Sequence, residues 1–464
     1  MTNRSRLILL CAAGALFTGC RSYDPDTYDA RLREATFEAY HDAIVDYYPD
    51  LDRVGLDPES LRTRWADEVI DAESATDYYH ALGRMCAALD DPHIRMTPNY
   101  EMWSQEDGPL GATDLRVVEV DGRPRLWNMA NDMFTELTRS QFDYNGWEVE
   151  VFDGAEPNND IIDDVINIGP RHSRIEIELA SPSGESRTVF PRKRGLRVRV
   201  LESDEIRIRR NGTSLYGDAG QSTREAVQAR ADAADLVRTY RGTYLDAWRI
   251  DDAAILLWNA AKTLPGYKKT EQLEEDLAEA AKVFEGTTCT LIDFRFQGGG
   301  KTPGFRAVME RLLDTDVKMT LRQESWFGFH DQTDRIRRSP AIVHGPTIVL
   351  ANEFTASYGE WMTALLDRER DAMIVGAQTQ GCEFCIVEIE APDRSRLRFG
   401  GKPYTRTEGI PAFQSVGLTP DVEVSTAADQ FDGGSLKAAL LDTHDRQTLT
   451  ALALLDELCE MASP

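Results

Sequence analysis

The chain has 464 residues, of which 42% are hydrophobic and 28% are charged, and its formal net charge is −27. This length and balance are typical of a soluble globular protein with about three domains. The strong acidic excess argues against nucleic acid as the main partner, because the phosphates would be repelled. The seven cysteines are too few for a disulfide scaffold in a chain this long.

The first residues are typical of an export signal. Arg4 and Arg6 precede the short apolar run LILLCAAGALF, and small residues follow it. This pattern predicts a signal peptide over residues 1–19, whereas the apolar run is too short to span a bilayer comfortably. The segment LFTGC resembles a bacterial lipobox, so we expect cleavage before Cys20 and attachment of lipid to it. In the alternative interpretation, the signal is an ordinary cleaved one and Cys20 has no special role.

The signal predicts where the protein works. We expect an exported protein of the bacterial cell envelope, held by lipidated Cys20 on the periplasmic side of the outer membrane if the cell is Gram-negative. An oxidising compartment permits disulfides, so a bond between Cys382 and Cys385 is one interpretation of CEFC. Two unbonded, half-buried thiols are the other.

The N-terminal half is predicted to contain a helical unit and a β-rich module. Residues 20–100 hold a short linker and apolar positions at helical spacing in YDARLREATFEAYHDAIVDYY, PESLRTRWADEVIDA and ATDYYHALGRMCAAL. Over residues 101–200 the period changes to two, in segments such as DLRVVEV and RIEIELA, which predicts strands. A charged connecting segment, residues 201–245, follows.

Over residues 246–464, apolar strand segments alternate with amphipathic helices. The strands include DDAAILLWN, TTCTLIDFRF, PTIVLAN and DAMIVGA, and a helical segment ends the chain. This alternation predicts an α/β fold with a mostly parallel sheet and helices on both faces. Ligands bind at the carboxyl ends of such strands, and two of these ends read RFQGGG and ANEFTAS.

Residues at these two strand ends are candidates for ligand binding or catalysis. Gly298, Gly299 and Gly300 would expose N–H groups that suit a phosphate or a developing oxyanion, or they form only a flexible turn. Ser357 lies near the start of a helix, where the helix dipole would favour a nucleophilic alkoxide. Ser357 and Glu360 also have the spacing of a capping box, which needs no chemistry at all. The local sequence leaves both interpretations open.

Five motifs in order resemble the C-terminal-processing (tail-specific) serine peptidase family. They are LGRMCAALDDPHIRM, LIDFR followed by GGG, VLANEFTAS, AMIVGAQTQG and GLTPDVEV, and the resemblance covers residues 28–424. It implies a ClpP/crotonase-like α/β core, with the β-rich module in the place of the family's PDZ-like domain. It also implies peptide cleavage by acyl transfer, with no cofactor and no metal.

The resemblance also implies a set of site residues. By position, Ser357 is the nucleophile. The backbone N–H groups of Gly299 or Gly300, together with that of Tyr358, form the oxyanion hole. Peptide cleavage needs both an activated nucleophile and an oxyanion hole, because an amide is a poor electrophile and its tetrahedral oxyanion must be stabilised.

The residue at the general-base position differs from that of the better-known branch of this family. That branch uses a lysine, and Cys382 stands at its position in TQGCEF. The tricorn-like branch instead uses a histidine before the PDZ-like domain, which corresponds to His93. A neutral imidazole can accept the serine proton near pH 7. The orienting glutamate of that branch corresponds to Gln414, which can hold geometry by hydrogen bonding but carries no charge.

The leading prediction is an exported, lipid-anchored serine endopeptidase that cuts peptides or unfolded protein segments. The PDZ-like module would hold the peptide as an added strand. Cys382 and Gln414 leave open a catalytically inactive peptide-binding lipoprotein on the same fold, and a hydrolase of non-peptide esters is a third possibility. The expected partners are peptide substrates and, through Cys20, a membrane. The sequence does not predict an oligomeric state.

Overall fold

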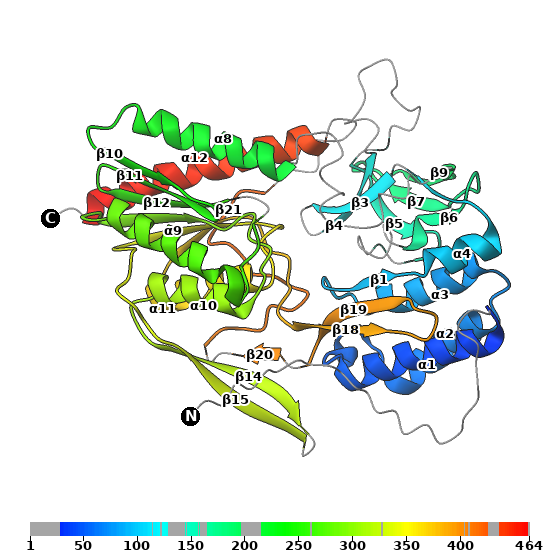
Figure 1. The fold of residues 1–464 in the computed structure, drawn as a ribbon. Helices are drawn as coiled ribbons and strands as arrows, with labels where there is room; N and C mark the ends of the chain where they lie inside the picture. The colour runs from blue at the N-terminus through cyan, green and yellow to red at the C-terminus, as the bar shows by residue number, and fades with distance from the viewer. Residues whose placement is uncertain are drawn as a thin grey trace.

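The computed structural model describes residues 28–113, 115–120, 123–128, 144, 146–155, 157, 165–195, 215–259, 262–325, 328–402, 404–406, 409–425 and 436–462. The predicted signal peptide and Cys20 lie outside the described residues, as does the first part of the charged connecting segment. Figure 1 shows the helical unit and the β-rich module on one side, and the α/β core on the other.

The N-terminal helical unit is confirmed. Its elements are α1 (Ala30–Tyr47), η1 (Leu51–Val54), α2 (Pro58–Ile70) and α3 (Ala75–Ala87), followed by α4 (Tyr100–Asp107). Each of the three long helices is preceded by a residue whose side chain accepts hydrogen bonds from the first turn: Asp29, Asp57 and Ser74. Such caps satisfy backbone N–H groups that have no partner within the helix.

The described part of the β-rich module contains two small sheets. A five-stranded sheet has the order β3-β4-β5-β7-β8, and a three-stranded sheet has the order β6-β2-β9. Their strands are β2 (Leu110–Ala112), β3 (Leu115–Val120), β4 (Arg123–Asn128), β5 (Glu148–Phe152), β6 (Ile168–Pro170), β7 (Ile177–Ala180), β8 (Ser186–Val189) and β9 (Arg194–Gly195). Ile177 and Leu179 are buried while Glu178 between them is exposed, as the period of two predicts.

The α/β core is built on a seven-stranded sheet with the order β10-β11-β12-β13-β16-β17-β21. The pairs β12–β13, β13–β16, β16–β17 and β17–β21 are parallel, whereas β10–β11 and β11–β12, at one edge, are antiparallel. The strands are β10 (Val237–Arg241), β11 (Leu245–Ile250), β12 (Ala253–Trp258), β13 (Cys289–Asp293), β16 (Thr347–Ala351), β17 (Met373–Gly376) and β21 (Val422–Glu423). The mostly parallel sheet is confirmed, although its first strand lies within the charged segment.

Helices cover both faces of this sheet (Figure 1). On one face Leu256 and Val349 pack in a core with α9, α10 and α11, and on the other Ile255 and Leu291 pack with α8 and α12. The core helices are α8 (Leu215–Ala231), η5 (Tyr267–Lys269), α9 (Thr270–Val283), α10 (Thr302–Leu312), α11 (Tyr358–Arg370) and α12 (Leu436–Ala462). Burial on both faces explains why β12, β13 and β16 are continuous apolar runs.

A hairpin of the core reaches across to the helical unit. It is formed by β18 (Cys385–Glu390) and β19 (Arg396–Gly401), and β19 pairs antiparallel with β1 (Arg95–Thr97) of the N-terminal half. In the hairpin turn, the buried carboxylate of Asp393 accepts hydrogen bonds from the hydroxyls of Tyr78 (3.0 Å) and Tyr79 (3.1 Å) on α3. The hairpin therefore fixes the segment just before β1 relative to the core.

A second hairpin was not predicted from the sequence. It is formed by β14 (Val317–Ser325) and β15 (Gly328–Ile336), and β20 (Tyr404–Arg406) pairs with β14. In Figure 1 it extends away from the body of the core. A long two-stranded ribbon lacks the continuous apolar run that identifies the strands of the central sheet.

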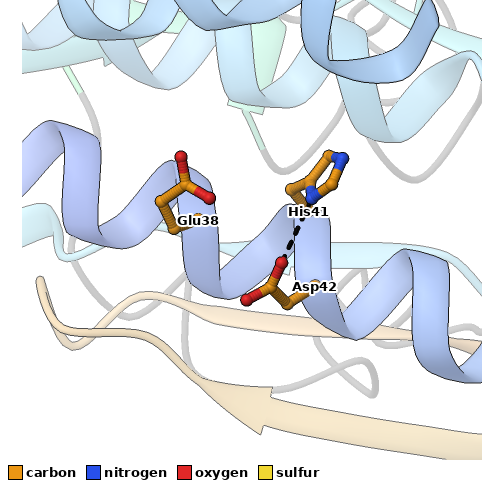
Figure 2. A group of neighbouring side chains, drawn as sticks. All are labelled: Glu38, His41 and Asp42. Carbon is orange, nitrogen blue, oxygen red and sulfur yellow. Dashed lines mark hydrogen bonds and ion pairs between the residues drawn. The ribbon is translucent and has the colours of Figure 1, made fainter. Parts of the chain in front are cut away.

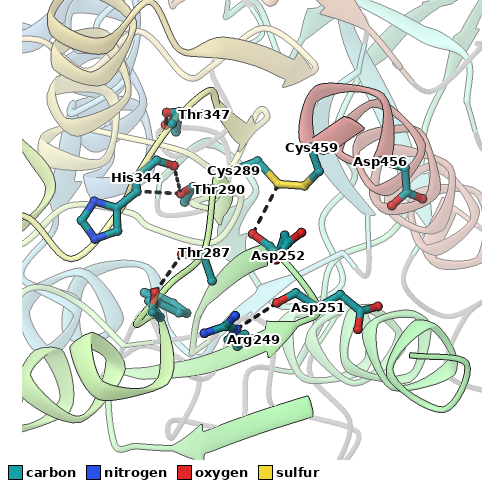
Figure 3. The surroundings of a disulfide bond; sticks show 12 residues. Arg249, Asp251, Asp252, Thr287, Cys289, Thr290, His344, Thr347, Asp456 and Cys459 are labelled. Atoms are coloured by element: carbon teal, nitrogen blue, oxygen red, sulfur yellow. Dashed lines mark hydrogen bonds between the residues drawn. A yellow bond between two sulfur atoms is a disulfide. The ribbon is translucent and has the colours of Figure 1, made fainter. Parts of the chain in front are cut away.

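The C-terminal helix α12 is attached to the central sheet in two ways. A disulfide joins Cys289 on β13 to Cys459 on α12, as Figure 3 shows. At the other end of β13, the fully buried guanidinium of Arg295 pairs with Asp293 (2.7 Å) and donates to the carbonyl oxygen of His444 on α12 (2.7 Å). Of the two interpretations of CEFC, the disulfide is wrong, since the structure does not join Cys382 and Cys385 by such a bond.

Among the described residues, no helix combines the length and the apolar character needed to cross a bilayer.

The disulfide generates a testable prediction about stability. The bond closes a long loop, since its cysteines lie 170 residues apart in the chain, and such a cross-link restricts the unfolded state. The Cys289→Ser, Cys459→Ser double variant should therefore lose about 2–4 kcal/mol of unfolding free energy in urea titrations. A reductant should lower the stability of the wild type and leave the double variant unchanged. Equal stability of the oxidised wild type and the variant would contradict this role.

Candidate active site

Ser357 occupies a strained position at the end of the β16–α11 turn. It is the residue immediately before α11, and its backbone angles are φ 54° and ψ −122°. A residue with a side chain adopts a positive φ only when its surroundings hold it there, at a cost of about 1–3 kcal/mol. The surroundings here include hydrogen bonds from Ala356 N to Gln297 O (3.1 Å) and from Trp361 N to Ser357 O (3.1 Å). The turn is thus built against the glycine-rich segment.

Only one of the three glycines faces Ser357. A Cβ atom at Gly299 would lie 2.7 Å from Ser357 Cβ, 3.0 Å from its Oγ and 3.0 Å from Tyr358 N. The corresponding position at Gly300 would instead meet the backbone of Leu264 at 2.5 Å, and at Gly298 it would meet nothing within 4 Å. The close approach, together with a φ of 85°, explains why residue 299 must be glycine.

Tyr358 closes the other side of the turn. It is the first residue of α11, so its N–H belongs to the positive end of the helix dipole. Its ring stacks on Phe305 with a centroid distance of 4.5 Å, and its hydroxyl forms a hydrogen bond with the Thr302 hydroxyl (2.8 Å). The structure therefore brings Ser357, Gly299 and the N–H of Tyr358 together, whereas Gly300 lies further round the turn.

A buried carboxylate accepts hydrogen bonds from the segments that form this site. Glu360 is fully buried and accepts hydrogen bonds from Ser357 N (2.9 Å), Thr379 Oγ1 (2.6 Å), Gly381 N (2.6 Å) and Cys382 N (2.7 Å). Burial raises the pKa of Glu360 to about 7, against the opposing effect of these hydrogen bonds. The S-x-x-E spacing predicts only a capping role for Glu360. In the structure it joins the Ser357 turn to the segment that contains Cys382.

Cys382 itself is buried and is not part of a disulfide. Its backbone shares a carboxylate oxygen of Glu360 with the backbone of Ser357, so the residue lies beside the serine turn. The next lysine along the chain, Lys402, lies 3.5 Å from the carbonyl oxygen of Asp46 on α1, through its Nζ. Lys402 therefore contacts the helical unit.

His93 lies in a buried turn together with Asp91. Asp91 accepts hydrogen bonds from His93 N (2.8 Å) and Gly400 N (2.6 Å), and its Oδ1 lies 4.0 Å from His93 Nδ1. In the part of the chain that the structure describes, His93 Nδ1 is buried without a hydrogen-bond partner. Burial, reinforced by the positive charges of Arg398 and Arg95, lowers the pKa of His93 to about 3.

The carboxyl group of Asp91 is also perturbed. Burial raises its pKa to about 6, while the hydrogen bonds it accepts act in the opposite direction. The sequence missed Asp91 as a site residue, although it stands two positions before His93. Two of its hydrogen-bond donors, Gly400 on β19 and Gln414, are distant in the sequence and lie beside Asp91 only in the folded chain.

Gln414 connects the His93 turn to the Cys382 segment. Its Oε1 accepts hydrogen bonds from Glu383 N (2.9 Å) and Phe384 N (3.1 Å), and its Nε2 donates to Asp91 Oδ1 (3.3 Å). A continuous network therefore runs from Ser357 through Glu360, the Cys382–Glu383 backbone and Gln414 to Asp91. Among the described hydrogen bonds, none joins the His93 imidazole directly to the Ser357 hydroxyl.

One group of side chains elsewhere has the composition of a metal site. Figure 2 shows Glu38, His41 and Asp42 together on α1. Both carboxylate oxygens of Glu38, however, bond to the guanidinium of Arg62, and His41 Nε2 lies 3.1 Å from the carbonyl oxygen of Pro58. Arg62 already supplies the positive charge at this group, and the group lies on the helical unit.

Comparison with known proteins identifies the class of the core. Residues 260–424 match the model described as peptidase family S41. These residues include the glycine-rich turn, Ser357 and Gln414, and the match defines the core as that of a peptidase. The chain therefore carries a peptidase family S41 domain, which confirms the predicted family, while the histidine-using branch stays a prediction.

Solved structures share the fold of nearly the whole chain. Mature CPAF in complex with lactacystin is 13% identical, with a TM-score of 0.57, and the match covers 92% of this chain and 99% of that chain. A suspected peptidase from Parabacteroides merdae is 13% identical, with a TM-score of 0.52 and coverage of 92% and 97%. No relative is found among curated proteins.

The Glu360 carboxylate generates a testable prediction about pH. Its pKa rises from 4.5 to about 7 on folding, so the folded protein holds this proton more tightly than the unfolded chain. The resulting stabilisation is full below about pH 4.5 and is lost as the pH rises through 7. Relative to Glu360→Gln, wild-type unfolding free energy should therefore fall across this window in urea titrations. A difference between the two proteins that does not vary with pH would contradict the raised pKa.

Proposed function

We propose that this protein is an exported, lipid-anchored serine endopeptidase that cleaves peptides or unfolded protein segments. Ser357 is the nucleophile, His93 is the general base, and the N–H groups of Gly299 and Tyr358 stabilise the oxyanion. The single observation that carries the proposal is the backbone of Ser357, whose positive φ presents the residue at the N-terminus of α11 with Gly299 against its side chain. A serine that served only as a helix cap would not need this strained conformation.

The acylation step uses these groups as follows. Ser357 Oγ attacks the carbonyl carbon of the scissile peptide bond, and its proton passes to the imidazole of His93. Negative charge on the former carbonyl oxygen is stabilised by the backbone N–H groups and by the positive end of α11. When the C–N bond breaks, the imidazolium returns the proton to the leaving amine. Water then hydrolyses the acyl-enzyme by the same sequence of proton transfers.

Asp91 provides the charge that Gln414 lacks. His93 Nδ1 lies 4.0 Å from Asp91 Oδ1, so a small rotation of the ring forms an Nδ1–H···Oδ1 hydrogen bond. Such a bond orients the ring, stabilises the imidazolium and opposes the lowering of the His93 pKa by burial. Gln414 holds Asp91 in place through its own hydrogen bond. In this proposal Cys382 replaces the family lysine and takes no part in proton transfer.

The location of the protein is proposed from its N-terminal sequence. The basic residues, the short apolar run and LFTGC support lipidation of Cys20. The Cys289–Cys459 disulfide supports an oxidising compartment. If the proposal is correct, wild-type protein will sediment with membranes of a bacterial host, whereas Cys20→Ala will be recovered in the soluble fraction. Equal membrane association of the two would contradict lipid anchoring at Cys20.

Cleavage of an unfolded protein substrate tests the catalytic proposal. Ser357→Ala and His93→Ala should each lower kcat/KM by about 10³-fold or more, since nucleophile and base act as one unit. His344→Ala is the matched control, because His344 is exposed and lies at the opposite end of β16 from Ser357. It should retain wild-type activity.

Two outcomes of this assay would contradict the proposal. Cleavage by Ser357→Ala at the wild-type rate would exclude Ser357 as the nucleophile. Absence of cleavage by the wild type, on protein whose thermal unfolding is cooperative, would favour the catalytically inactive peptide binder. Hydrolysis of small esters without any cleavage of protein substrates would instead favour the esterase.

A further inference from the structure

The side chain of Gln297 lies beside the proposed oxyanion hole. The residue is fully buried in the turn that follows β13, and its carbonyl oxygen accepts a hydrogen bond from Ala356 N (3.1 Å). A Cβ atom at Gly359, in the first turn of α11, would lie 2.0 Å from Gln297 O and 3.2 Å from Gln297 Cγ. The side chain therefore passes along the N-terminus of the helix that carries Ser357.

The amide oxygen of Gln297 is bonded to the glycine that faces Ser357. Gly299 N donates to Gln297 Oε1 at 2.8 Å. Gly299 is also the glycine at which an added Cβ would meet the Ser357 side chain and Tyr358 N. The Gly299 N–H group, which the proposed function places in the oxyanion hole, is thus already bonded to a carbonyl oxygen from the same chain.

The other end of the same amide is unsatisfied. Since Gly299 N–H must donate to an oxygen, the orientation of the amide is fixed and Nε2 is the remaining end. Among the described residues, Gln297 Nε2 is buried without a hydrogen-bond partner. A side chain that served only to stabilise the turn would be expected to have both polar ends satisfied, because an unpaired buried amide is costly.

We propose that Gln297 is an internal ligand of the oxyanion hole. In the resting protein its Oε1 occupies the Gly299 N–H, and the reacting carbonyl oxygen of a substrate must displace it. The displacement favours the tetrahedral intermediate over the bound ground state, since an oxyanion accepts a stronger, charge-assisted hydrogen bond than a neutral amide oxygen does. This inference rests on the proposed role of Ser357 as nucleophile.

The rate of labelling by a fluorophosphonate tests this proposal, because phosphonylation of a serine also needs a free oxyanion hole. The variant Gln297→Met keeps the length of the side chain but removes the carbonyl oxygen. It should be labelled about three- to tenfold faster than the wild type, the factor that corresponds to one neutral hydrogen bond. Gln221→Met, on the exposed surface of α8, is the matched control and should be labelled at the wild-type rate.

A labelling rate of Gln297→Met at or below that of the wild type would overturn the proposal and would show that Gln297 only supports the turn. A second variant keeps the test decisive if Gln297→Met unfolds more easily. Gln297→Glu places a charged, stronger acceptor on the same N–H, so it should be labelled more slowly than the wild type. Labelling as fast as the wild type would overturn the proposal.

Two controls separate the failure of this inference from that of the proposed function. Ser357→Ala should remain unlabelled under the same conditions. A wild-type protein that is not labelled at all would contradict the proposed function, and this inference with it. A wild-type protein that is labelled at Ser357, with neither Gln297 variant changing the rate as described, would contradict the inference alone.

Discussion

The buried carboxylate of Glu360 is the interaction on which the site depends. It lies in the first turn of α11 and binds four donors, which come from the Ser357 turn and from the segment at residues 379–382. A carboxylate with this many hydrogen bonds can remain in a dry interior, whereas an amide or a hydroxyl could not satisfy all four. The strained backbone of Ser357 is held by the same contacts, so Ser357 and the neighbouring segment are positioned together.

The second constraint is the hairpin β18–β19, which begins where the Glu360-bound segment ends. Because β19 pairs with β1, the hairpin connects the core to the N-terminal half. The bond from Gly400 N to Asp91 also fixes the turn that contains Asp91 and His93. Gln414 completes the connection from the core side. Sheet pairing thus positions the turn that contains His93, although it is remote from Ser357 in the sequence.

Features of this arrangement that depend on local sequence patterns could be predicted, whereas contacts between distant segments could not. The buried parallel strands and the turn at Ser357 could be predicted, because continuous apolar runs and strand-to-helix transitions are local patterns. The four donors of Glu360, the partners of Asp91 and the Cys289–Cys459 bond could not, since each joins segments that are distant in the chain. Cys382 illustrates the limit: its position beside the serine turn was implied by the motif, but only the fold shows that it forms no disulfide with Cys385.

Identification of the residue that reacts with a fluorophosphonate tests the central claim most directly. After labelling and proteolysis, mass spectrometry should find one phosphonyl group on the peptide that contains Ser357, at the serine itself. Prior heat denaturation should abolish the adduct, because the reactivity comes from the folded turn and not from serine alone. An adduct on another serine, or none on folded protein, would contradict the account of Ser357 as an activated nucleophile.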